Sequence, residues 1–297
     1  MSVTITTDMI KRLREETGAG VLECKKALEA SNGDFDKAIL FLRERGLATA
    51  AKKAGREAND GLVSLHVDAQ GRWGVILEVN CETDFVARTE DFRAFAKALL
   101  QQLCDEPAIS DVATLLERPF APDPSVTVGQ QLTALVAKLG ENIIIRRFAR
   151  LQRDGSGWIE GYLHPGDRIG VILHVSAGDA HVAESAAFRE LVHDLALQVA
   201  AAAPKYVAPT DIPSAVLEAE RALYRAQIAD EPKPEAIKER IIAGKLDKWY
   251  EAVCLLRQPF IRDDALRIAD LLEQKSKQLG TPLTVERFVR YELGAGE

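Results

Sequence analysis

The chain has 297 residues, of which 47% are hydrophobic and 28% are charged, and its formal net charge is −7 at pH 7. This length allows more than one domain with a sizeable buried core, and the composition is that of a globular protein. The negative charge weighs against direct binding of nucleic acid, which usually depends on a basic stripe or tail.

Three short segments near the N-terminus carry apolar residues at helical spacing: 8–16, 21–30 and 35–45. The Thr17-Gly18-Ala19-Gly20 turn is expected to end the first helix. Asp34 is expected to cap the third helix, and Gly46 to end it. We expect a small three-helix bundle followed by a solvated connector at 48–57, and we assign this module to residues 1–56.

The pattern then changes to alternation. Val63, Leu65 and Val67 alternate with polar residues, a turn follows at 68–71, and 73–79 is a more continuous apolar run, so we expect a β-hairpin. Further along we expect helices at 90–103 and 128–139, a loop at 107–124 and a strand at 143–151. A first core unit is assigned to residues 57–141.

The chain then repeats a pattern. The run from Arg72 to Val79 recurs from Arg168 to Val175, and Arg147-Phe148-Ala149-Arg150 recurs as Arg287-Phe288-Val289-Arg290. The order of elements also recurs, with a strand at 158–163 and helices at 183–202 and 264–279. We therefore expect an α+β fold with two related core units, each a small antiparallel sheet with helices on one face. The alternative is a chance likeness between apolar strands.

The second core unit is assigned to 142–205 and 257–297, with an insertion at 206–256. Within the insertion, 214–229 and 235–256 have helical patterns separated by the prolines of 231–234, which predicts a helical hairpin. Two arrangements stay open at this point: the hairpin projects from its unit, or it folds flat on the core.

The residues that usually carry chemistry do not gather into a pattern. The cysteines and histidines show no CxxC pair and no metal-ligand spacing, and no nucleophile elbow or P-loop is present. Glu78, Glu82 and Asp84 are close in sequence, but carboxylates at a strand end are more often solvated. We expect reduced thiols, no catalytic residues, no metal and no cofactor.

The N-terminal residues lack a signal-peptide core, and no stretch is apolar for long enough to cross a bilayer. We therefore expect a cytoplasmic protein without a membrane partner.

The segment Cys81-Glu82-Thr83-Asp84-Phe85-Val86 directly follows the apolar strand at 73–79. In one interpretation Thr83 or Asp84 caps a helical turn and Phe85 packs into the core. In the other, an acid and a large ring lie at an exposed tip. From the residues alone the first interpretation is favoured.

Several motifs resemble those of the elongation factor Ts family. They are Thr17-Gly18-Ala19-Gly20, Cys24-Lys25-Lys26-Ala27-Leu28, Asn32-Gly33-Asp34, Ala51-Lys52-Lys53-Ala54-Gly55, the run from Glu78 to Val86, Gly140-Glu141-Asn142-Ile143, His164-Pro165-Gly166 and Gln258-Pro259-Phe260. They span nearly the whole chain in the family's order. The resemblance implies a ubiquitin-associated-like N-terminal module, a two-part core and an inserted hairpin that serves as a dimerisation or coiled-coil module. Many relatives continue into a further helical module, whereas this sequence ends at Glu297.

The resemblance also implies a function. The chain would be a guanine-nucleotide exchange factor that binds elongation factor Tu in its GDP-bound and nucleotide-free forms, without covalent chemistry. Thr83, Asp84, Phe85 and Val86 would form a wedge that disturbs the magnesium and phosphate site. Further contacts with the partner would come from residues at matching positions: Arg14, Val21, Leu22, Lys25 and His164. The competing classes are a binding scaffold that does not act on a GTPase and a metal- or carboxylate-dependent enzyme.

Overall fold

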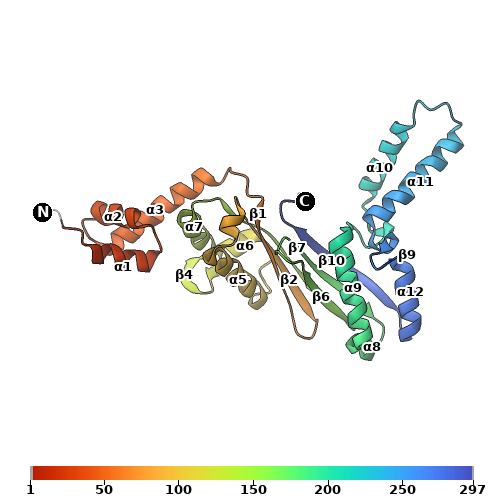
Figure 1. Ribbon diagram of the computed structural model, residues 1–297, viewed down its shortest axis with the longest axis horizontal. Helices are drawn as coiled ribbons and strands as arrows, with labels where there is room; N and C mark the ends of the chain where they lie inside the picture. Colours follow the sequence, from red (N-terminus) through yellow and green to blue (C-terminus); the bar gives the residue numbers. More distant parts are fainter. Residues whose placement is uncertain (1–2, 296–297) are drawn as a thin grey trace. The chain divides into compact units, whose positions relative to one another are not determined.

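The computed structural model describes residues 3–295, which form three N-terminal helices followed by small antiparallel sheets with helices (Figure 1). The described chain divides into two compact units, one made of residues 3–64, 77–148 and 292–295, and the other of residues 65–76 and 149–291. Within the described residues no helix is both long and apolar enough to cross a membrane. The expected α+β class is confirmed.

The three N-terminal helices are α1 (Thr7–Thr17), α2 (Val21–Ala30) and α3 (Phe35–Lys53). Gly18 ends α1 in the left-handed conformation, with φ of 67°, and the Asp34 side chain accepts the backbone N–H of Lys37 at the start of α3. Both predicted helix boundaries are therefore confirmed. The helices enclose a small apolar cluster of Leu13, Cys24, Ala27, Leu28 and Ala38.

Helix α3 does not end at Gly46 but continues to Lys53, so the predicted helix end and most of the predicted solvated connector are wrong. Gly46 is buried in the helix interior. A Cβ built on Gly46 would lie 3.6 Å from the Ala137 Cβ of helix α7 (Val128–Leu139). Gly46 therefore faces α7 from within the helix, with room for an ordinary van der Waals contact, and does not end the helix.

The first sheet has the strand order β1-β2-β5, with β1 at Asp60–Val67, β2 at Trp73–Cys81 and β5 at Ile143–Gln152. Between β2 and β5 lie α4 (Asp84–Ala87), α5 (Glu90–Asp105), α6 (Val112–Glu117), a two-stranded ribbon of β3 (Pro119–Phe120) and β4 (Asp123–Thr127), and α7. The predicted loop at 107–124 is thus wrong over α6, β3 and the start of β4. Helix α6 forms because Asp111 accepts the backbone N–H of Thr114 at 2.7 Å and Leu115 is fully buried.

The second sheet has the order β10-β7-β6, with β6 at Gly157–Leu163, β7 at Ile169–Ala177 and β10 at Leu283–Glu292. Strands β6 and β7 pair antiparallel, and α9 packs on both (Figure 1). The other elements of this unit are α8 (Ala180–Glu184), α9 (Ala186–Ala202), α10 (Ser214–Gln227), α11 (Glu235–Val253), β8 (Pro259–Phe260), β9 (Asp263–Arg267), α12 (Ile268–Leu279) and two short 3-10 turns, Pro209–Asp211 and Leu255–Arg257.

Two predicted helices of this unit need correction. The helix expected at 183–202 is two helices, because extended Ser185 ends α8 and its side chain accepts the backbone N–H of Phe188 to begin α9. The segment expected as a helix at 264–279 begins as strand β9 and becomes helical only at Ile268. Strand β9 pairs with β8 through Phe260 and Asp263.

The ribbons of the two units match in detail. Pro119 pairs with Thr127 in one, and Pro259 pairs with Arg267 in the other. Each ribbon is held by a buried glutamine. Gln102 donates to the Pro119 carbonyl and accepts from the Ala121 N–H, while Gln198 makes the same two bonds with Pro259 and Ile261.

The helical hairpin of α10 and α11 has an apolar cluster of its own, formed by Ile228, Ile242 and Leu246. No residue between Ser214 and Gln227 is buried. The arrangement in which the hairpin folds flat on the core is therefore not the one observed.

Candidate functional site

The strand-to-helix corner after β2 combines a fixed backbone with an exposed ring. Thr83 accepts the backbone N–H of Val86 at 3.4 Å and so caps the single turn of α4, as the capping interpretation predicts. That interpretation also puts Phe85 in the core, and this part is wrong: the Phe85 side chain is 80% exposed. Val86, the next residue, is buried and anchors the turn.

One carboxylate from a distant part of the sequence holds this corner. Glu141 lies between the C-terminal glycine of α7 and strand β5. Its Oε2 accepts the backbone N–H groups of Glu82 at 3.1 Å and Thr83 at 3.0 Å, and its Oε1 accepts the Thr83 hydroxyl at 2.6 Å. Charge-assisted bonds of this kind are about twice as strong as neutral ones.

A second carboxylate makes a reciprocal contact. Glu82 accepts the backbone N–H of Asn142 at 2.7 Å and pairs with Arg56 at 3.4 Å. The Asn142 side chain in turn donates to the Arg56 carbonyl at 2.8 Å. The hydrogen bond from Asn142, together with the Arg56 charge, lowers the pKa of Glu82 below its usual value. Glu82 is therefore an ionised anchor and not a proton donor at neutral pH.

Asp84 and Cys81 complete the corner. Asp84 lies in the first turn of α4, half-exposed, and pairs with Arg88 at 2.8 Å. The buried Cys81 thiol donates to the Thr83 carbonyl at 3.1 Å. Burial, with the nearby Glu141 carboxylate, raises the pKa of Cys81 to about 12, so it is an unreactive thiol and part of the packing.

The other residues predicted to contact a partner in the first unit gather around the turn between α1 and α2. Arg14 lies in the last turn of α1, and its carbonyl accepts the Gly18 N–H at 2.8 Å. Val21 and Leu22 open α2 with 53% and 70% of their side chains exposed. Lys25, one turn on, is exposed and pairs with Glu29 at 3.8 Å. The turn thus displays two apolar side chains beside two cations.

His164 belongs to the second unit, in the turn between β6 and β7, where it is exposed. Its Nδ1 lies 2.9 Å from the Tyr162 hydroxyl, and its backbone N–H donates to the Ile169 carbonyl at 2.9 Å. The first contact orients the imidazole, and the second holds the backbone of the turn.

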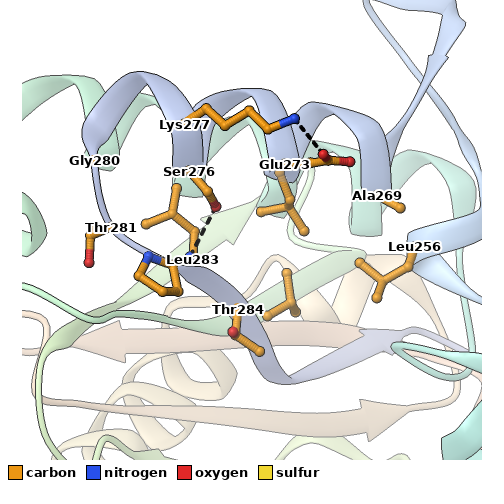
Figure 2. Close-up of a pocket in the computed structure, with 12 residues that line it drawn as sticks. Leu256, Ala269, Glu273, Ser276, Lys277, Gly280, Thr281, Leu283 and Thr284 are labelled. Carbon is orange, nitrogen blue, oxygen red and sulfur yellow. Dashed lines mark hydrogen bonds and ion pairs between the residues drawn. The ribbon is translucent and has the colours of Figure 1, made fainter.

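A groove of about 700 Å³ lies between α12 and the start of β10 and contains none of these residues (Figure 2). Leu256, Leu272 and Leu283 supply apolar surface, and an ion pair between Lys277 and Glu273 lies at its side. Over residues 3–295 no group of three His, Cys, Asp or Glu side chains could hold a metal ion. Neither place assembles the nucleophile, base and orienting group that bond chemistry needs.

The comparisons with known proteins agree with one another. Residues 82–295 match a family model described as Elongation factor TS. A protein named Elongation factor Ts from Clostridium novyi (strain NT) is 45% identical over 98% of this chain and 94% of its own length. Proteins of the same name from Clostridium perfringens (strain 13 / Type A) and Clostridium kluyveri (strain NBRC 12016) are 44% and 43% identical over the same shares.

Proposed function

The chain belongs to the elongation factor Ts family, non-enzymatic exchange factors that act on elongation factor Tu in translation elongation, and we propose that it promotes GDP release by disturbing that partner's magnesium and phosphate site. The activity would be exercised in the cytoplasm. The observation that carries the proposal is the exposed Phe85 ring on a corner that two carboxylates hold in place.

The thermodynamics of exchange set what the surface must do. A factor that releases GDP binds the nucleotide-free partner more tightly than the GDP-bound one, and by linkage GDP weakens the factor's binding by the same ratio. Every ~1.4 kcal/mol of difference between the two binding free energies corresponds to about a tenfold difference in affinity. A useful exchange factor needs several kcal/mol of this difference. We therefore assign it two surfaces, a wedge that acts at the magnesium and phosphate site and a second surface, called the grip, that holds the partner elsewhere.

In this proposal Thr83, Asp84, Phe85 and Val86 are the wedge. Phe85 inserts its ring beside the elements that hold the magnesium ion. Asp84 brings a carboxylate toward an ion whose positive charge holds the phosphates, and so competes for its coordination. Thr83 and Val86 support the other two residues: Thr83 caps α4, and the buried Val86 anchors it.

The grip is assigned to the turn between α1 and α2. Val21 and Leu22 supply apolar contact, and Arg14 and Lys25 supply charge complementarity, which favours rapid and specific association. His164 adds a contact from the second unit. The exposure of all five side chains supports this assignment.

We also propose finer features of the fold and assembly. The three N-terminal helices form a ubiquitin-associated-like module, and the matched ribbons support a duplication of the core unit. The hairpin would pair two copies of the chain, alone or in a complex of two factors with two partners. Helix α10 supports this pairing because its exposed face carries an apolar stripe of Ala215, Val216, Ala219, Ala222, Leu223 and Ala226.

The nucleotide dependence of binding tests the function directly. Purified protein is mixed with nucleotide-free elongation factor Tu and passed over a sizing column, with and without GDP. We expect a stable complex with the nucleotide-free partner, and we expect GDP with magnesium to dissociate it. A complex that forms equally well with and without GDP would instead indicate a binding scaffold.

A further inference from the structure

We infer that Glu141 is a positioning residue of the exchange reaction. Its carboxylate holds the Thr83–Phe85 corner rigid, so the backbone keeps its conformation when the Phe85 ring inserts into a partner. The inference rests on the proposed function of Phe85. It starts from the three hydrogen bonds that one carboxylate accepts from two consecutive residues of the corner.

The three hydrogen bonds to Glu141 lie at the part of the backbone that would otherwise shift when the Phe85 ring inserts. Helix α4 has only four residues, and a helix this short has little stability of its own. The ring of Phe85 is 80% exposed and has few contacts that could fix it from outside. Its position is therefore set through the backbone of Glu82 and Thr83, and both N–H groups point at the same Glu141 oxygen.

Glu141, which clamps the corner through these hydrogen bonds, is itself anchored by the residues on both sides of it. Gly140, which ends α7 with φ of 78°, accepts a hydrogen bond from Lys53 at the end of α3 through its carbonyl. Asn142, on the other side of Glu141, donates its side chain to the Arg56 carbonyl. The corner is thus tied to the end of the helix that also carries the N-terminal bundle, so wedge and grip share one support.

The second unit contains a corner of the same kind that is built differently. There Asp179 caps α8 by accepting the His181 N–H at 2.7 Å, and the Gly178 N–H donates to the Pro282 carbonyl at 3.0 Å. Thr281 follows the glycine that ends α12, as Glu141 follows the glycine that ends α7. A backbone carbonyl therefore suffices to form such a corner. The carboxylate occurs at the corner that displays a large exposed ring.

The test compares exchange kinetics of Glu141→Ala and Glu141→Gln in the full chain, measured as release of fluorescent GDP from elongation factor Tu over a range of factor concentrations. Glu141→Ala should lower the maximal rate about tenfold, equivalent to ~1.4 kcal/mol. Glu141→Gln keeps one acceptor oxygen for the two N–H groups and should lose only about threefold. The half-saturating concentration should stay within about twofold, because the grip is untouched.

Two further measurements separate positioning from general damage. In a Phe85→Ala background, Glu141→Ala should cause a smaller additional loss than in the wild type, because the ring is then absent and the corner positions only Asp84. Hydrogen exchange of the peptide covering residues 82–86 should accelerate in Glu141→Ala without any partner present. The matched control is Glu106→Ala, which removes a carboxylate that also accepts three hydrogen bonds, from Gln102 and Arg118, and should exchange at the wild-type rate.

A folded Glu141 variant of either kind with the wild-type rate would overturn the inference, and so would losses that multiply with that of Phe85→Ala. The failure of the wider proposal looks different: the wild-type protein itself would not accelerate GDP release. If the wild type is active and Phe85→Ala is slow while both Glu141 variants are normal, only the positioning role falls.

Discussion

The residue on which the account depends most is Phe85. Since its side chain is 80% exposed, Phe85→Ala removes almost no buried surface, and the melting temperature should change little. Its exchange rate should nevertheless fall at least about tenfold, equivalent to ~1.4 kcal/mol of lost differential binding. Thermal unfolding and GDP-release kinetics on the same samples measure both.

The matched control is Phe92→Ala, in helix α5 of the same unit. Phe92 is fully buried, so this variant should lose about 3–5 kcal/mol of stability. If Phe85→Ala destabilised the protein as Phe92→Ala does, Phe85 would be a core residue and the wedge assignment would be wrong.

His174 gives a prediction about pH. It is buried on strand β7, and burial lowers its pKa below 6.5, an effect to which Arg153 adds and Glu286 is opposed. Below pH 6.5 the unfolded chain therefore binds a proton that the folded chain resists. Stability falls as pH decreases through this range, by at most ~1.4 kcal/mol per pH unit from this group.

The comparison of wild type with His174→Asn isolates that contribution. Unfolding in urea at pH 7.5 and pH 5.5 should show a smaller loss of stability for the variant than for the wild type. Equal losses in the two proteins would mean that His174 is protonated in the folded state as readily as in the unfolded one.

At the site, the local sequence predicts the cap but not the exposure. Thr83 is recognisable as an N-cap from the sequence, because Ser, Thr, Asp and Asn are the residues that most often cap helices. A helix of four residues is too short to show which face is buried, so only the family resemblance indicated that Phe85 faces outward. Glu141 could not be paired with Thr83 from spacing, because no local pattern joins residues so far apart in sequence.

At the scale of elements, Gly46 tests the continuity of α3. The sequence predicts that α3 ends at this glycine. A glycine that ends a helix usually takes the left-handed conformation, in which any other side chain would be strained. In the structure Gly46 lies within the helix, and a Cβ there would make an ordinary contact of 3.6 Å with the Ala137 Cβ. Gly46→Ala should therefore stabilise the protein by about 0.5–1 kcal/mol.

The measurement is the urea midpoint of Gly46→Ala against the wild type, with Gly18→Ala as the control. Gly18 does end a helix, with φ of 67°, so the alanine variant should be destabilised there. Destabilisation of both variants would return Gly46 to the role of a helix end.

The other elements show which patterns can be read from sequence. Helix α7 has the predicted bounds because it carries a full amphipathic period, a Thr127 capping box and a terminal glycine. The prolines of the ribbon β3–β4 favour a loop when the sequence is considered alone. Pro119 and Pro124 are tolerated there because a two-stranded ribbon leaves edge positions that need no N–H donor. The break at Ser185 was hidden in a continuous helical pattern.

At the scale of the whole molecule, the repeat in the sequence predicted matching elements, and the glutamines Gln102 and Gln198 show how closely they match. The sequence did not indicate where the two halves diverge in detail. His181 stands at a corner like that of Phe85, and Thr281 follows a helix-ending glycine as Glu141 does, but only the structure shows that these positions correspond.

The assembly of the chain depends on the hairpin. If the apolar stripe of α10 pairs two copies, Leu223→Glu should shift the protein toward the monomer, because a charge would be buried in the contact. Leu223 is 52% exposed within the chain, so the monomer itself should fold normally. Sedimentation over a range of concentrations measures this. A wild-type protein that stays monomeric at high concentration would contradict the pairing.

The exchange activity is measured most directly as the release of a fluorescent GDP analogue from elongation factor Tu in excess unlabelled GDP. We expect substoichiometric amounts of this protein to accelerate release strongly, since each molecule is freed when new nucleotide binds. A folded protein that binds elongation factor Tu but leaves the release rate unchanged would contradict the exchange mechanism.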